Sequence, residues 1–259
     1  MPYTALITGA SSGIGLELAK IHASKGGDLV LVARNKAKLD QLKSELVQTY
    51  GISVSIIVID LSAEGSAKKI YDRTTVEKIQ IDCLINNAGF GDFGFFSDTD
   101  LQKEVNMINL NIMALTLLTK LYLKDMLDRK GGRIMNVASI AAFQPGPKMA
   151  VYSATKAYVL SFSQAVGNEV LHQGVTVTAL CPGPTESGFQ EAASMQNSKM
   201  FNNNKLPTAG EVAAYGYEAM LKGKSVAIPG FINNLMADAV GFIPREWVLK
   251  LVRKIQDAA

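Results

Sequence analysis

The stretch Thr4-Ala5-Leu6-Ile7-Thr8-Gly9-Ala10-Ser11-Ser12-Gly13-Ile14-Gly15 decides the fold of this chain. A short apolar run leads into a Gly-x-x-x-Gly-x-Gly turn, and apolar residues at helical spacing follow from Leu16. Glycines let a chain turn tightly, and the uncapped N–H groups at a helix N-terminus bind phosphate. The pattern therefore predicts a strand, a turn and a helix, with Gly9, Ser11, Ser12, Gly13, Ile14 and Gly15 binding the pyrophosphate of a dinucleotide. A glycine-rich turn without a ligand is the alternative.

Short β-rich runs recur along the rest of the chain, separated by amphipathic segments. They lie at 6–7, 29–32, 54–59, 83–85, 133–137, 175–180 and 225–228. Strands that alternate with helices indicate βαβ units, and nearly continuous apolar strands indicate a parallel sheet buried on both faces. We predict one α/β domain over residues 1–259. It carries a polar, poorly periodic insertion at about 186–210 and a helical extension at about 232–259.

The composition excludes several classes of protein. Hydrophobic residues make up 48% of the 259 residues and the net charge is +3, so the chain is neither disordered nor a basic nucleic-acid binder. Two cysteines and two histidines predict neither a disulfide scaffold nor a metal site. The sequence shows no basic-then-apolar leader and no apolar run of about 18–20 residues, so we expect a cytoplasmic protein.

Further candidate cofactor residues follow the second, third and fourth predicted strands. Arg34 stands where NAD-binding proteins of this type carry an acidic residue, and a guanidinium suits a 2′-phosphate by charge and geometry. We therefore predict NADP(H) in preference to NAD(H), against the alternative of a solvated arginine. Asp60-Leu61 and Asn86-Asn87-Ala88-Gly89 come at carboxyl ends of strands, where open α/β sheets bind ligands. Asp60 alone is also consistent with a helix cap, and Asn86–Gly89 with a turn.

A tyrosine and a lysine indicate acid–base chemistry. Tyr152 and Lys156 are four residues apart, which places them on one face of a helix, and Ser139 precedes the tyrosine by thirteen residues. An ammonium beside a phenol favours the phenolate, so the pair predicts a lowered tyrosine pKa and proton transfer near neutral pH.

Together these motifs, in this order, resemble the short-chain dehydrogenase/reductase family in its single-domain branch. The resemblance runs from about Thr4 to Pro184 and includes Asn111 and Pro182-Gly183. It implies a Rossmann-like, doubly wound parallel sheet of about seven strands in the order 3-2-1-4-5-6-7, with helices on both faces. It also implies a catalytic set of Asn111, Ser139, Tyr152 and Lys156. Asn109 competes with Asn111, whose Leu-Asn-Ile register fits better.

The resemblance further implies a role for each site residue. Tyr152 is the general acid/base, Ser139 binds the substrate carbonyl, Lys156 binds the nicotinamide ribose, and Asn111 holds a water that relays protons to Lys156. Further cofactor contacts are implied for Asn87, Ala88, Gly89, Pro182, Gly183 and Thr185. The expected function is an NADP(H)-dependent oxidoreductase that interconverts a carbonyl compound and an alcohol. A non-catalytic NADP(H) sensor is the alternative. A homodimer or homotetramer through the helices before strands five and six is implied as well.

Apolar residues in three segments suggest a hydrophobic substrate. They are Phe90, Phe93, Phe95 and Phe96, then Phe143, Pro145, Pro147 and Met149, then Phe189, Met195, Met200 and Phe201. Packing or subunit contact is the equal alternative. The segment 235–255 alternates apolar and basic residues and is divided by Pro244. Such a helix lies on an anionic membrane, or it packs on the core, the substrate site or another subunit. We favour packing.

Overall fold

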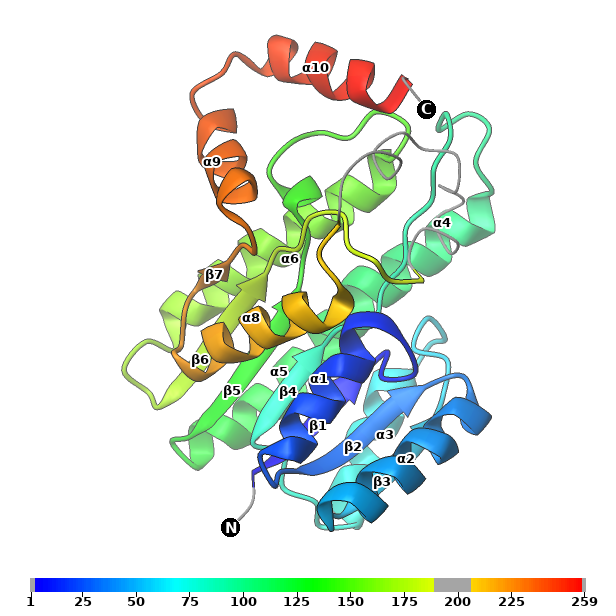
Figure 1. The fold of residues 1–259 in the computed structure, drawn as a ribbon, viewed down its shortest axis with the longest axis vertical. Helices are drawn as coiled ribbons and strands as arrows, with labels where there is room; N and C mark the ends of the chain where they lie inside the picture. The colour runs from blue at the N-terminus through cyan, green and yellow to red at the C-terminus, as the bar shows by residue number, and fades with distance from the viewer. Residues whose placement is uncertain (1–2, 189–205, 258–259) are drawn as a thin grey trace.

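The computed structural model describes residues 3–188 and 206–257 (Figure 1). Seven parallel strands form one sheet in the order β3-β2-β1-β4-β5-β6-β7. The strands are β1 (Thr4–Thr8), β2 (Asp28–Ala33), β3 (Val54–Val58), β4 (Cys83–Asn86), β5 (Gly132–Val137), β6 (Val175–Leu180) and β7 (Val226–Ala227). The predicted fold class and strand order are confirmed.

Helices cover both faces of this sheet (Figure 1). One face carries α1 (Gly13–Ser24), α2 (Lys36–Tyr50) and α8 (Ala209–Leu221). The other carries α3 (Ser66–Val76), α5 (Leu115–Asp128) and α6 (Ala150–Glu169). Helix α4 (Leu101–Ile108) runs through a π-helical turn, η1 (Asn109–Ala114), into α5, and a 3₁₀ turn, η2 (Ile140–Ala142), follows β5. Two last helices, α9 (Phe231–Val240) and α10 (Arg245–Asp257), lie on either side of Pro244.

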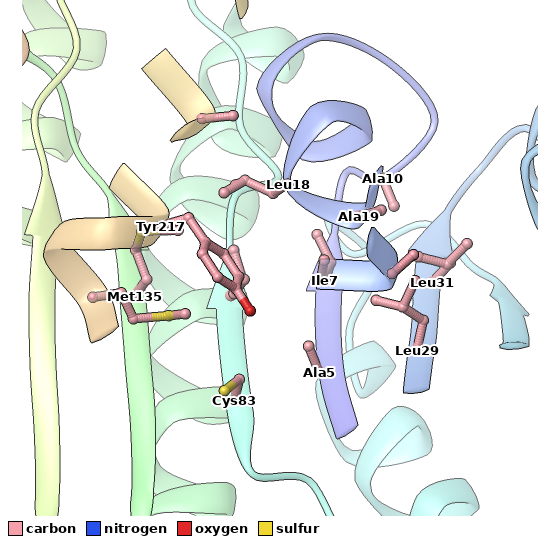
Figure 2. Packing of buried hydrophobic residues seen from close by; sticks show 14 of the residues in the cluster. Ala5, Ile7, Ala10, Leu18, Ala19, Leu29, Leu31, Cys83, Met135 and Tyr217 are labelled. Carbon is pink, nitrogen blue, oxygen red and sulfur yellow. The ribbon is translucent and has the colours of Figure 1, made fainter. Parts of the chain in front are cut away.

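The two hydrophobic cores explain why the strands are apolar at nearly every position. Ile7 of β1 points into one core, and its neighbour Leu6 points into the other. Figure 2 shows the first core, where Leu18 and Ala19 of α1 belong to one cluster with Ile7 of β1, Leu31 of β2 and Tyr217 of α8. Since both faces of the sheet are buried, a strand side chain meets apolar neighbours whichever face it points to.

Tyr217 of α8 and His22 of α1 tie these two helices together in the first core. The Tyr217 hydroxyl and His22 Nδ1 are 2.8 Å apart, and His22 Nε2 is 2.8 Å from the Tyr3 carbonyl. Because a carbonyl only accepts, Nε2 donates to it. Burial lowers the pKa of His22, which favours the neutral imidazole, and in that form Nδ1 accepts from the Tyr217 hydroxyl. Within residues 3–188 and 206–257, no cluster of three or more His, Cys, Asp or Glu side chains is placed to hold a metal.

The predicted insertion at 186–210 has its two ends side by side. The Glu186 N–H donates to the Pro207 carbonyl at 3.0 Å, and Thr208 caps α8 together with Glu211. The candidate pocket residues Phe189, Met195, Met200 and Phe201 lie outside the described residues. No helix in the described part of the chain is long and apolar enough to cross a membrane.

Candidate active site

A cavity of about 2470 Å³ opens at the carboxyl ends of the strands. The strand order reverses direction between β1 and β4, and the crevice at such a point is where open α/β sheets bind ligands. The predicted site residues that line the cavity are Gly9, Ser11, Ser12, Gly13, Ile14, Arg34, Asp60, Leu61, Asn87, Ala88, Gly89, Ser139, Tyr152, Lys156, Pro182, Gly183 and Thr185. Gly15 and Asn111 do not line the cavity and lie behind those that do.

The glycine turn between β1 and α1 needs its glycines for backbone geometry. Gly9 and Gly13 have φ of +67° and +54°, which side-chain-bearing residues rarely adopt. A Cβ on Gly15 would overlap the Gly9 carbonyl and the amide of Asn87. The Ser12 side chain makes no capping hydrogen bond, so the first N–H groups of α1 are left uncapped by it. The turn therefore presents backbone N–H groups to the cavity.

Thr8 and Asn87 connect this turn to the end of β4. The Thr8 hydroxyl accepts hydrogen bonds from the Asn87 and Ala88 N–H groups, both at 3.0 Å, and donates to the Ile85 carbonyl. The Asn87 amide donates to the Thr8 carbonyl at 2.9 Å and to the Gly9 carbonyl at 3.3 Å. Sequence reasoning missed Thr8; its position at the last residue of a strand before the glycine turn was the available signal.

Arg34 and Asp60 form an exposed ion pair at one end of the cavity. Arg34 Nη1 is 3.7 Å from Asp60 Oδ2, and 79% of the Arg34 side chain is exposed. Partial burial opposes ionisation of Asp60, but hydrogen bonds from Ser62 and the charge of Arg34 outweigh it and lower the Asp60 pKa. Lys38, which the sequence analysis did not select, lines the same end of the cavity. Two cations thus face the space beyond the glycine turn.

Ser139, Tyr152 and Lys156 converge at the centre of the cavity, and all three are buried. Tyr152 lies in the first turn of α6, and its hydroxyl is hydrogen-bonded with the Ser139 side chain. Lys156 follows one turn later and donates to the Val137 carbonyl at 2.8 Å. Ser139 also accepts from the Ala141 N–H at 3.1 Å, which fixes it at the start of η2.

The predicted lowering of the tyrosine pKa is wrong for this structure. Burial raises the pKa of Tyr152 to about 12, and the Ser139 hydrogen bond opposes only part of that rise. The Lys156 ammonium lies 5.8 Å from the centre of the Tyr152 ring and is hydrogen-bonded to Val137 instead. Burial lowers the pKa of Lys156 itself to about 8. Burial, which favours the neutral phenol of Tyr152, therefore outweighs the attraction between a phenolate and the Lys156 charge.

Asn111 reaches the site because η1 is a π-helical turn, a rare geometry often found at functional sites. Its Oδ1 accepts from the Phe90 N–H at 3.2 Å, and its Nδ2 donates to the Phe90 carbonyl and the Thr155 hydroxyl, each at 3.0 Å. A Cβ on Gly89 would lie 3.0 Å from Asn111 Oδ1 and 3.3 Å from Lys156 Nζ. Both polar atoms thus border the space beside Gly89. Thr155 is a further residue that the sequence analysis missed.

Few of the aromatic and apolar candidates for the substrate pocket line the cavity, which favours the alternative of packing or subunit contact for the others. Of the aromatic and apolar candidates among the described residues, only Phe90 and Met149 line the cavity. Phe143 packs against a buried cluster, whereas Phe95 and Phe96 are exposed. The C-terminal helices α9 and α10 supply most of the apolar lining instead. Contact between residues 235–255 and the substrate site is one of the alternatives that the sequence left open.

Several known proteins are similar to this chain in sequence and in structure. Residues 3–198 match the model of the short chain dehydrogenase family. A relative from Anas platyrhynchos, named very-long-chain 3-oxoacyl-CoA reductase, is 39% identical over 257 residues, covering 96% of this chain and 78% of the relative. The structure of a short-chain dehydrogenase from Sphingobium yanoikuyae in complex with NADPH is 32% identical, with a TM-score of 0.85 and 96% of each chain covered.

A bulky-bulky ketone specific alcohol dehydrogenase from Comamonas testosteroni is 31% identical, with a TM-score of 0.79 and 93% of each chain covered. The family match spans most of the chain, and two of these similarities extend over almost all of it. The chain is therefore a member of the short-chain dehydrogenase/reductase family, whose proteins are oxidoreductases that use NAD(P)(H).

Proposed function

We propose that this protein uses NADP(H) to interconvert a hydrophobic carbonyl compound and its alcohol, with Tyr152 as the general acid/base. One observation carries the proposal: the Tyr152–Ser139 hydroxyl pair is buried in the cavity that also contains the glycine turn. The names of the relatives, a 3-oxoacyl-CoA reductase and a bulky-ketone alcohol dehydrogenase, are consistent with a carbonyl substrate.

The residues of the cavity fit a nicotinamide dinucleotide. The turn from Gly9 to Gly13 offers N–H groups and no side chain that would block a pyrophosphate. Arg34 and Lys38 suit a 2′-phosphate. The Asp60 carboxylate lies 3.7 Å from the Arg34 guanidinium and neutralises its charge only in part. Pro182, Gly183 and Thr185 line the same cavity, and the Thr185 hydroxyl donates to the Gly183 carbonyl at 2.9 Å.

The bound cofactor supplies the hydride, and the chain supplies the proton and its position. With a pKa of about 12, Tyr152 is protonated at neutral pH and can donate to the oxygen of a reduced carbonyl. The Ser139 hydroxyl donates to the same oxygen and orients it. Lys156, whose pKa is about 8, borders the space beside Gly89, and so does Asn111. From there the two side chains return a proton toward Tyr152.

A tyrosine replacement tests the chemistry. Tyr152→Phe should lose turnover by at least about 10³-fold and keep NADPH affinity within a few-fold. Tyr158→Phe is the matched control, because Tyr158 lies on the same helix and its hydroxyl pairs with Thr116 away from the cavity. Turnover retained in Tyr152→Phe would refute the role of Tyr152. NADPH binding without turnover of any carbonyl compound in the wild type would favour the sensor alternative.

We also propose that the protein is a homodimer or homotetramer through α4, η1, α5 and α6. Large apolar side chains are exposed along this continuous helical segment at Leu101, Val105, Ile108, Met113 and Leu117, and Tyr158 is exposed on α6. Exposed apolar stripes of this kind are typical of subunit interfaces. The cytoplasmic location expected from the sequence is a proposal that cell fractionation would test.

A further inference from the structure

We propose that α9 and α10 form a roof that binds a long, flexible hydrocarbon chain of the substrate, and that Met236 and Trp247 set the preference for chain length. The inference rests on the proposed carbonyl chemistry and names the class of substrate: a carbonyl compound with an unbranched apolar chain, rather than a compact ring ketone.

The first observation is how little these helices pack. Figure 1 shows α9 and α10 standing above the carboxyl ends of the strands, apart from the two helical layers. No residue of α9 is buried, although seven of its sequence positions are apolar: Phe231, Ile232, Leu235, Met236, Ala237, Ala239 and Val240. Phe231 is 83% exposed and Trp247 is 68% exposed. Apolar side chains this exposed indicate a surface that another apolar molecule covers.

The second observation is which way these side chains face. Most of them line the same cavity as Tyr152, namely Phe231, Ile232, Met236, Val240, Ile243, Trp247, Leu251 and Val252. The charged residues Asp238, Arg245, Glu246, Lys250 and Lys254 do not line it. The cavity side of the roof is therefore uncharged and largely apolar, with Asn233 and Gln256 as its polar members, which suits a hydrocarbon chain and excludes a charged tail.

The third observation is the length of this apolar surface. Helix α9 has 10 residues and α10 has 13, which at 1.5 Å per residue makes them about 15 Å and about 20 Å long. The cavity of about 2470 Å³ extends from the glycine turn to Gln256 near the end of α10. A compact ketone would leave most of this lining in water, whereas a long chain covers it.

The fourth observation is that the far end of the roof is attached. The guanidinium of Arg253 lies 5.1 Å from the centre of the Phe95 ring, and Lys148 Nζ lies 5.2 Å from the same centre. Such cation–π contacts are attractive even at exposed sites. Val248, in the first turn of α10, is buried. Contacts near both ends thus hold α10 over the cavity, while Trp247 and Leu251 stay exposed.

A membrane surface and a second copy of the chain are the other candidate occupants. Exposed apolar residues of the same segment that do not line the cavity, Leu235, Phe242 and Leu249, would serve either of these. They are fewer than those that face the cavity. Residues 231–257 carry four basic and three acidic side chains, a net charge of +1, which gives little attraction to anionic lipid.

The test is a series of unbranched alkan-2-ones, from hexan-2-one to dodecan-2-one, reduced with NADPH. Each methylene buried under the roof should raise kcat/KM by up to about fourfold, the equivalent of about 0.8 kcal/mol. The double variant Met236→Ser/Trp247→Ser should flatten this rise, so that the ratio of kcat/KM for dodecan-2-one to kcat/KM for hexan-2-one falls toward one. The matched control Leu235→Ser/Leu249→Ser, on the outer side of the same helices, should keep the wild-type rise.

Trp247 also provides a readout that needs no turnover, since it is the only tryptophan of the chain. Dodecan-1-ol should shift its fluorescence to shorter wavelength, and hexan-1-ol at the same concentration should not. If kcat/KM does not rise with chain length while short ketones are reduced normally, the roof proposal is wrong and the proposed function stands. No turnover of any ketone, together with the dodecan-1-ol shift, would remove the proposed function and keep the binding site. Loss of the rise in the Leu235→Ser/Leu249→Ser control would overturn the roof in favour of a membrane or subunit contact.

Discussion

The amide nitrogen of Asn111 donates a hydrogen bond to the hydroxyl of Thr155 at 3.0 Å, and this bond joins the π-helical turn η1 to helix α6. Thr155 directly precedes Lys156 and itself donates to the Tyr152 carbonyl at 2.7 Å. One threonine therefore connects the three residues that are expected to handle the proton, without lining the cavity itself.

Replacing this hydroxyl should lower kcat without weakening cofactor binding. Thr155→Val keeps the shape but leaves one buried N–H of Asn111 unpaired, which costs about 1–3 kcal/mol. Half of this cost expressed in the position of Asn111 lowers kcat by about 2- to 10-fold. Steady-state kinetics measure the change, with KM for NADPH unchanged. Thr155→Ser restores the hydroxyl and should recover most of kcat; an equal loss in both variants would show that packing, and not the hydrogen bond, matters.

The rate of carbonyl reduction should fall at alkaline pH. Burial lowers the pKa of Lys156 to about 8, so its ammonium is present below that pH and lost above it. The Tyr152 phenol, with a pKa of about 12, stays protonated over the same range. The pH profile of kcat/KM reports the free enzyme. We expect it to decline above about pH 8 in the wild type; a profile that stays level up to pH 10 would contradict the role of Lys156.

Arg34→Ala should reverse the preference between cofactors. Loss of a charge-assisted contact to a 2′-phosphate costs about 1.5–3 kcal/mol, which is about 10- to 100-fold in kcat/KM for NADPH. NADH, which lacks this phosphate, should be almost unaffected. Lys36→Ala is the control, because Lys36 is close in sequence but pairs with Asp40 and does not line the cavity. Equal losses with NADPH and NADH would argue against a 2′-phosphate at Arg34.

His22 should make the folded state less stable in mild acid. Burial lowers its pKa in the folded protein, with partial opposition from the Tyr3 carbonyl, Asp28 and Asp82. The unfolded chain then binds a proton near pH 6.5 that the folded chain does not, so stability is present above that pH and is lost as the pH falls below it. The slope is at most about 1.4 kcal/mol per pH unit. Urea unfolding of wild type and His22→Gln between pH 5 and 7.5 measures it; equal slopes would exclude His22 as the cause.

A charge on the apolar stripe of η1 and α5 should dissociate the proposed oligomer. Met113→Glu places a carboxylate on a residue that is half exposed in the isolated chain and would be buried between subunits. Light scattering after size-exclusion chromatography should give a multiple of 27.8 kDa for the wild type and the single mass for the variant. Val76→Glu, on an exposed apolar residue of α3, is the control. A wild-type protein that elutes as a monomer would end the proposal.

The sequence by itself determined the fold and most of the glycine and polar residues that line the cavity. Apolar runs with strand-like composition, glycines at the first strand–helix turn and ordered motifs at strand ends each depend on local chemistry, so spacing alone locates them. The glycine turn, Arg34, Asp60, Ser139, Tyr152 and Lys156 all lie where the sequence predicted, at one edge of one sheet.

Only the tertiary structure decided the environment of these residues. The Tyr152 pKa rises because the surrounding elements exclude water, and no spacing in the sequence reports how completely they do so. The π-helical turn that brings Asn111 to Thr155 is invisible to a helical period. The apolar lining of the cavity comes from α9 and α10, more than 70 residues after Tyr152, because the path of the chain after β7 returns them over the site. Contacts between distant segments and the water they exclude are properties of the folded arrangement, not of any local pattern.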